Sequence, residues 1–244
     1  MACEEAASRR NVLALNSTLN EYIRRLASPW GRALALTFVV FLLTLVVYYL
    51  TKAPTTVANG PVRLADAFLH GRLDIANGAD LQGYLDFAFY EGKYYVLEPP
   101  AMAIVVLPGV VLFGLALNQT VVSVVIGSLA IAMVHRLMVG LTEKASVQIW
   151  MTALFGFGTI FWWMSTQGGI WYFAHAVSVL FLLVAIYETL VTKRPFTAGF
   201  FLGASYLARL PVILAFPFFL IMLSDQWLRE SSEPLRESIK RGPA

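Results

Sequence analysis

The chain alternates long apolar runs with short polar connections. Its first long run, residues 33–50, reads ALALTFVVFLLTLVVYYL, and a helix needs about 20 mainly apolar residues to cross a bilayer. The pattern therefore predicts an all-α protein, a polytopic transmembrane helical bundle with about six spans. The further runs that we assign to spans cover residues 120–137, 147–164, 169–190, 197–207 and 211–228.

One polar stretch, residues 61–108, interrupts this pattern. An irregular polar segment cannot lie in hydrocarbon, because its backbone groups would remain unpaired, so we place it at the membrane surface. Within it, residues 61–73 are predicted to form a helix, with Pro61 in its first turn and Gly71 at the start of its exit. The apolar face of this helix would lie on the membrane. Further along, Glu91 and Gly92 separate two aromatic arms, which predicts a β-hairpin.

The basic residues determine the expected topology. Arg32 and the arginines before it flank the first span, so the positive-inside rule places the N-terminus in the cytoplasm. If the apolar run 99–117 also crossed, the later loops with Lys144 and Arg194 would face outward, against that rule. We therefore predict that this run lies on the outer surface without crossing. The chain then divides into a cytoplasmic N-terminal segment (1–32), a transmembrane domain (33–228) with a long extracytoplasmic first loop containing surface helices (51–118), and a cytoplasmic tail (229–244).

The composition supports a multi-pass integral membrane protein. The chain is 58% hydrophobic and 14% charged, whereas soluble domains are more polar. The net charge of +3 does not indicate nucleic-acid binding, because the basic residues lie mainly at the two ends and in short loops. A single cysteine, Cys3, excludes an internal disulfide and a cysteine-based metal cluster.

Three carboxylates of the first loop are candidate catalytic residues. Asp66, on the expected helix, is placed to act as a general base or as a ligand of a divalent cation; the alternative is a solvated side chain paired with Arg63. Asp86 and Glu98 are each embedded among apolar residues, where a carboxylate often has a function. The alternative for both is solvation at a turn or a strand edge.

The candidate substrate-binding residues include an arginine and a histidine. Arg209 has a rigid fork of donors that suits phosphate, and its alternative is snorkelling to the lipid headgroups. His175 either lines a site or makes an interhelical hydrogen bond. The expected topology places both on the outer side together with Asp66. The remaining candidates on that side are Gln167, Trp171, Tyr94 and Tyr95, whose aromatic members either stack on sugar rings or anchor the protein at the interface.

Two strings, LADAFLHGRLDI and FYEGKYYVLEPPAMAIVVLPGVVLFG, resemble the first outer loop of GT-C superfamily glycosyltransferases, such as the polyprenyl-phosphate-sugar-dependent mannosyltransferases. The resemblance implies a surface-helix loop with a catalytic acid soon after the first span, for which Asp66 is the match. It also implies sugar transfer from a lipid-phosphate-linked donor to an acceptor outside the cytoplasm. A basic group or a divalent cation, Mg²⁺ or Mn²⁺, would steady the leaving phosphate, although we assign no residue to a metal site.

Members of that superfamily are about twice as long. We therefore expect this chain to correspond to their N-terminal half, with the rest of the donor pocket in a missing C-terminal half or in a second subunit. The alternative function is a non-catalytic membrane scaffold or lipid-binding subunit. A transporter is less favoured, because no internal repeat is visible. The expected partners are a lipid-linked sugar donor and membrane lipids, in a bacterial or archaeal plasma membrane.

Overall fold

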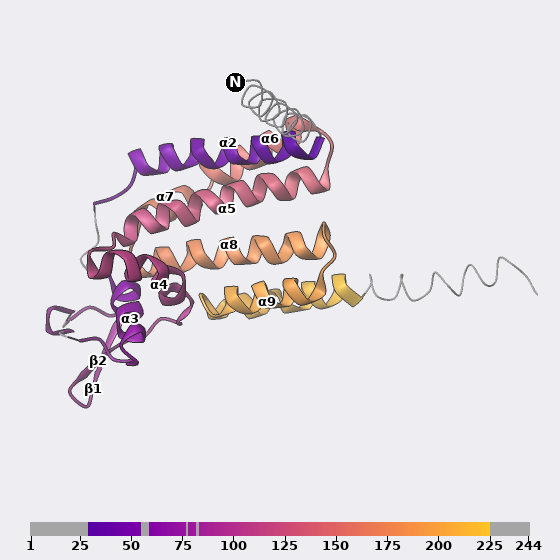
Figure 1. Cartoon of the computed structure of the whole chain (residues 1–244). Coiled ribbons are helices and arrows are strands. Elements are labelled where there is room, and N and C mark those ends of the chain that lie inside the picture. Colours follow the sequence, from indigo (N-terminus) through magenta and orange to yellow (C-terminus); the bar gives the residue numbers. More distant parts are fainter. Residues whose placement is uncertain (1–28, 55–58, 77, 82, 225–244) are drawn as a thin grey trace, which may run out of the picture.

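The computed structural model describes residues 29–54, 59–76, 78–81 and 83–224 (Figure 1). The expected cytoplasmic tail lies outside these residues, and so does the expected N-terminal segment up to residue 28.

The described chain is mostly helical, which confirms the all-α class, and its long helices run side by side (Figure 1). Three of them are long and apolar enough to cross a membrane: Trp30–Leu50, Gln119–Leu141 and Ile170–Leu190. Two further helices, Ala145–Phe157 and Phe161–Gln167, are bent by 50° relative to each other, and together they are long and apolar enough to cross if they count as one span. The helices of the bundle are α2 (Pro29–Leu50), α5 (Gln119–Leu141), α6 (Ala145–Phe157), α7 (Phe161–Gln167), α8 (Ile170–Leu190) and α9 (Pro195–Tyr206).

Local chemistry explains where several of these helices begin. The side chain of Asn118 accepts a hydrogen bond from the Val121 amide at 3.2 Å and so caps α5. Gly168, with φ at +67°, separates α7 from α8 in a conformation that favours glycine. Pro195 begins α9 at a position where its missing N–H costs nothing.

The expected outer loop forms a compact group of short elements at one end of the bundle, which we call the loop end (Figure 1). The predicted hairpin is confirmed, with its turn at Glu91 (φ 49°) and Gly92 (φ 78°). Both turn residues lie in the left-handed region that the tightest hairpin turns require. The elements of the group are α3 (Gly60–Leu69), η1 (Gly78–Leu81), β1 (Phe87–Tyr90), β2 (Lys93–Val96), α4 (Ala101–Phe113) and η2 (Gly114–Ala116).

The apolar face of α3 packs inside the protein. Val62 and Ala65 are fully buried in one cluster with Met102 of α4 and Phe173 of α8. The expectation that this face lies on the membrane was therefore wrong, because α4 offers a protein surface that buries it. The helix ends at Leu69, four residues before the predicted end at residue 73, and Gly71 follows with φ +67°.

Helix α4 accounts for most of the apolar run that we expected not to cross. Met102 and Val106 of this helix are buried in the same cluster as Val62 and Ala65 of α3. The helix lies at the loop end among α3 and the hairpin (Figure 1). These features accord with a helix that remains on one side of the membrane.

The chain reverses after α9. Helix α9 ends at Tyr206, and Arg209 has an extended backbone with φ −147°. A 3-10 segment, η3 (Leu210–Ala215), then begins the apolar helical stretch Leu210–Ser224, which runs back beside α9 (Figure 1). Arg209 is thus presented at the tip of a helical hairpin.

Candidate functional site

Arg209 lies at the centre of a polar cluster at the loop end. Its Nη2 donates a hydrogen bond to Nε2 of His175 at 2.9 Å, and its Nη1 lies 3.6 Å from Oε2 of Glu98. The side chains of Arg209 and Glu98 are only 19% and 13% exposed. Because an isolated charge is costly to remove from water, each of these two charges stabilises the other in this position.

Trp171 and Asp86 extend the cluster. The indole Nε1 of Trp171 donates to Oδ1 of Asp86 at 2.7 Å. The Arg209 guanidinium lies 5.4 Å from the centroid of the Trp171 ring, within the range of a cation–π contact. We refer to five side chains as the Arg209 cluster: Asp86, Glu98, Trp171, His175 and Arg209.

Three separate parts of the chain position this cluster. Trp171 and His175 are four residues apart in the first turns of α8, so they share one face of that helix. The β-hairpin brings its two flanks together, because the Leu97 amide donates to the Asp86 carbonyl at 3.1 Å. Arg209 comes from the reversal after α9. The sequence predicted a common side for these residues, and the structure places them in direct contact.

The cluster holds one carboxyl with a shifted pKa. Burial raises the pKa of Glu98 above its ordinary value, and the charge of Asp86 adds to this effect, whereas Arg209 opposes it. One N–H donor of Arg209 is unsatisfied, because its Nε is buried and has no hydrogen-bond partner among the described residues. The arrangement therefore combines an available N–H donor on a cation with a carboxylate that accepts a proton more readily than usual.

An apolar groove of about 590 Å³ opens beside the cluster, lined by residues of α4, α8 and α9. Gly199 and Gly203, one turn apart on α9, leave room in it, because a Cβ at either glycine would meet no atom within 4 Å. At the groove's edge, the Ala101 amide donates to the Leu207 carbonyl at 3.2 Å. Glu98 precedes Ala101 by three residues along the chain, and Arg209 follows Leu207 by two. A ligand with an apolar chain and an anionic head would suit this combination.

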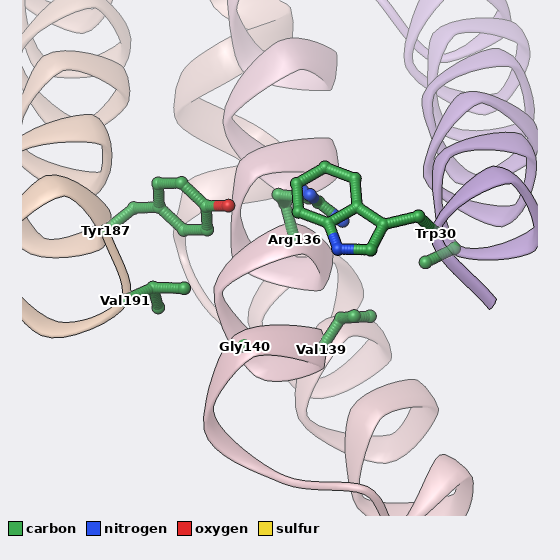
Figure 2. Close-up of a pocket in the computed structure, with 7 residues that line it drawn as sticks. Trp30, Arg136, Val139, Gly140, Tyr187 and Val191 are labelled. Atoms are coloured by element: carbon green, nitrogen blue, oxygen red, sulfur yellow. The ribbon is translucent and has the colours of Figure 1, made fainter.

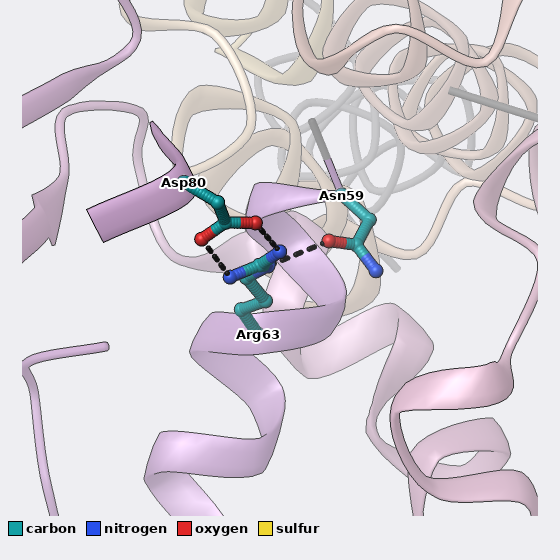
Figure 3. A network of polar contacts seen from close by, with 3 residues as sticks. All are labelled: Asn59, Arg63 and Asp80. Carbon is teal, nitrogen blue, oxygen red and sulfur yellow. Dashed lines mark hydrogen bonds and ion pairs between the residues drawn. The ribbon is translucent and has the colours of Figure 1, made fainter. Parts of the chain in front are cut away.

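Asp66 is not joined to the Arg209 cluster by any hydrogen bond or ion pair within the part of the chain that the structure describes. Its carboxylate lies 3.7 Å from Nδ1 of His70. The pairing with Arg63 that we considered as its alternative is wrong, because Arg63 donates to Asp80 at 3.0 and 2.5 Å and to Asn59 at 2.8 Å (Figure 3). These bonds from Arg63 hold the pKa of the Asp80 carboxyl below its ordinary value.

Tyr94 and Tyr95 lie on the hairpin. The Tyr94 ring packs 4.9 Å from that of Phe89 and covers Gly78, where an added Cβ would come within 2.6 Å of the ring. Tyr94 thus has a packing role. Tyr95 is paired with Ala88 across the strands, and because strand side chains alternate, it faces away from Tyr94.

Gln167 lines a different cavity. That cavity, of about 510 Å³, lies between the end of α2 and the bend of α6 and α7, where Thr51, Trp162 and Trp163 also line it. Gln167 is therefore separate from the groove, which involves α4, α8 and α9.

Among the described residues, no group of three or more His, Cys, Asp or Glu side chains is placed to hold a metal ion. The chain matches no protein-family model, no curated protein and no solved structure.

Two structural features were not predicted from the sequence: the Arg63–Asp80 pair and the open face of α9. Small residues at a spacing of four, Gly199 and Gly203, were the available signal for the second.

Proposed function

We propose that this protein is a membrane glycosyltransferase of the GT-C kind, or the part of one that holds the donor lipid. It would transfer a sugar from a lipid-phosphate-linked donor to an acceptor on the extracytoplasmic side. The observation that carries the proposal is the pairing of Arg209 with Glu98 at the edge of an apolar groove.

The groove suits the isoprenoid chain of such a donor. Its volume of about 590 Å³ and its lining from three helices favour a long apolar ligand over a soluble sugar nucleotide. Arg209 suits the phosphate, because a guanidinium offers parallel donors to phosphate oxygens.

Glu98 is our candidate general base in place of Asp66. When a phosphate takes the donors of Arg209, Glu98 loses its partner, and its raised pKa rises further. The carboxylate then accepts the proton of an acceptor hydroxyl while that oxygen attacks the anomeric carbon. The bond from this carbon to the phosphate oxygen breaks, and Arg209, oriented by its hydrogen bond to His175, holds the departing lipid phosphate.

The proposal includes a topology. We infer six spans from α2, α5, the bent α6–α7 pair, α8, α9 and Leu210–Ser224. The loop end would face outward, because Lys144, Lys193 and Arg194 lie on the connections at the opposite end.

The second candidate function is a lipid-phosphate-binding subunit without catalysis. It is favoured by the same ion pair, since a carboxylate already held by Arg209 is not a free base in this state. The two candidates share the ligand and differ only in the role of Glu98.

The test is transfer of radiolabelled sugar from a polyprenyl-phosphate donor in membranes that contain the protein. Loss of a general base typically slows a reaction by about 10²–10⁴-fold, so we expect Glu98→Gln to lose transfer by that factor. Asp66→Asn, on α3, is the matched control and should retain transfer. Equal transfer by the wild type and Glu98→Gln would reject Glu98 as the base, and lipid binding without any transfer would favour the second candidate.

A further inference from the structure

A second arginine, Arg136, lines a pocket (Figure 2). It lies near the C-terminal end of α5, at the end of the bundle opposite the loop end (Figure 1). The pocket has a volume of about 280 Å³ and lies between α2, α5 and α8. The Arg136 guanidinium carbon is 4.2 Å from the ring centroid of Trp30 and 5.9 Å from that of Tyr187. The cation therefore stands between two aromatic walls that come from different helices.

The donors of this pocket are unused. Among the described residues, no hydrogen bond or ion pair involves the Arg136 guanidinium, the Trp30 indole N–H or the Tyr187 hydroxyl. In Figure 2 the Tyr187 hydroxyl points across the pocket toward the side where Arg136 and Trp30 lie. A guanidinium alone presents five N–H donors. The pocket thus offers a set of donors around one cation, which is the complement of an anion with several acceptor oxygens.

The floor of the pocket is closed by the contact of two helices. Gly140 of α5 lies so close to Val191 that an added Cβ would come within 2.6 Å of its side chain. Val139 and Ala33 add apolar lining. A ligand held here would have its anionic group at Arg136 and apolar surface around it, as at the boundary between headgroups and acyl chains.

The charge around the pocket favours an anion. Lys144 and Arg194 lie on the connections at the same end of the bundle. The described carboxylates at this end are Glu143 and Glu188, and the cations are Arg32, Arg136, Lys144, Lys193 and Arg194. The positive charges therefore outnumber the negative ones at this end of the bundle. Arg136 is five residues before the end of α5, a depth of about 7.5 Å, which a phosphate below the headgroup surface can reach.

We propose that this pocket binds the phosphate of an anionic phospholipid, with Arg136 as its principal donor and Trp30 and Tyr187 as the walls. This site is separate from the Arg209 cluster in its residues and in its end of the bundle. It therefore holds whether or not the protein transfers a sugar.

The test uses the full chain purified in an uncharged detergent, with bound lipid counted by native mass spectrometry. The probes are phosphatidylglycerol, phosphatidylcholine and inorganic phosphate. We expect phosphatidylglycerol to bind in preference to phosphatidylcholine, and Arg136→Ala to weaken it about tenfold, which corresponds to about 1.4 kcal/mol. Lys144→Ala removes one exposed charge at the same end of the bundle and should leave the affinity within about twofold.

Each other outcome overturns the proposal. Equal binding by the wild type and Arg136→Ala rejects the pocket, and equal losses in Arg136→Ala and Lys144→Ala indicate a diffuse surface charge instead. Displacement of the lipid by millimolar inorganic phosphate would assign the site to a soluble anion. If Arg136→Ala fails to fold, Tyr187→Phe replaces it, because this variant removes one hydroxyl only. The affinity of Tyr187→Phe for phosphatidylglycerol should be about threefold weaker, within the range of one lost hydrogen bond. An unchanged affinity contradicts the proposal.

Discussion

Arg209 and Arg136 are two arginines near opposite ends of one helical bundle, and each lies over a tryptophan ring. Their other neighbours differ. Arg209 donates to His175 and faces Glu98 at 3.6 Å, whereas Arg136 has only aromatic contacts among the described residues.

The difference indicates two ways to keep a cation within a membrane protein. A carboxylate partner allows Arg209 to be largely buried, and it also places a proton acceptor next to a guanidinium, a group whose geometry suits phosphate. Aromatic walls allow Arg136 to keep all its donors for a ligand at the boundary of the bundle. The first arrangement suits chemistry, and the second suits binding alone.

The largest expected difference between the two arginines is in sugar transfer. Removing one group that stabilises transition-state charge costs about 10²–10³-fold in rate, so Arg209→Ala should lose transfer by at least that factor. Arg136→Ala should stay within about twofold, because it lies at the other end of the bundle. Rates in membranes at saturating donor test this, and similar losses in both variants would remove the distinction.

The next largest difference between the two arginines should be the loss of folding stability when each is replaced by alanine. Arg209→Ala leaves the largely buried Glu98 carboxylate without its partner, which should destabilise the fold by about 1–3 kcal/mol. Arg136→Ala breaks no hydrogen bond within the described residues but removes the contact with the Trp30 ring, so it should cost about 0.5–1 kcal/mol. Thermal unfolding in lipid-free detergent at neutral pH provides the measurement. An Arg136→Ala variant as unstable as Arg209→Ala would mean that Arg136 has a structural partner.

A smaller effect should appear in the pH dependence of stability. Because burial raises the pKa of Glu98 in the folded state, the protonated form favours folding. The stability that Glu98 contributes is present below its unfolded pKa, about 4.3, and is lost as the pH rises through its folded pKa. As the pH rises from 4 to 7, the unfolding temperature of Glu98→Gln should therefore increase relative to that of the wild type. A constant difference between the two proteins over this range would show that the Glu98 pKa is not raised.

The smallest expected effect is at Arg63. Arg63 forms an ion pair with Asp80, whose side chain is 51% exposed. Exposed ion pairs contribute little to stability and are screened by salt. Arg63→Ala should lower the unfolding temperature less than Arg209→Ala does, and the loss should shrink in 0.5 M salt. A loss that salt does not change would indicate that the contacts with Asn59 and the packing of the stem matter more than the charges.

Much of the loop end could be predicted from the sequence. The Glu91–Gly92 turn between aromatic arms specifies a hairpin locally, so its register needed no tertiary information. The helix from Pro61 and its exit at Gly71 were likewise local signals. The partner of its apolar face could not be read in the same way, because spacing identifies a face but not the surface that covers it.

The site was predicted in part for similar reasons. Arg209, His175 and Glu98 carry charge or a ring nitrogen among apolar residues, so their isolation marked them as candidates. Their mutual contact depends on the reversal after Tyr206, which the tertiary bond from Ala101 to Leu207 helps to hold. Arg136 was not among the candidate residues, because its aromatic neighbours come from helices distant in sequence.

The central claim is that the Arg209 cluster binds a phosphate-bearing lipid at the edge of the groove. Its most direct test is the affinity of the purified protein for a short-chain polyprenyl phosphate, compared among the wild type, Arg209→Ala and Arg136→Ala. A lost charged hydrogen-bond donor weakens binding by about 1.5–3 kcal/mol, so Arg209→Ala should lose more than about tenfold in affinity, while Arg136→Ala keeps it. Equal affinity of the wild type and Arg209→Ala for the polyprenyl phosphate would mean that the Arg209 cluster does not bind the lipid phosphate.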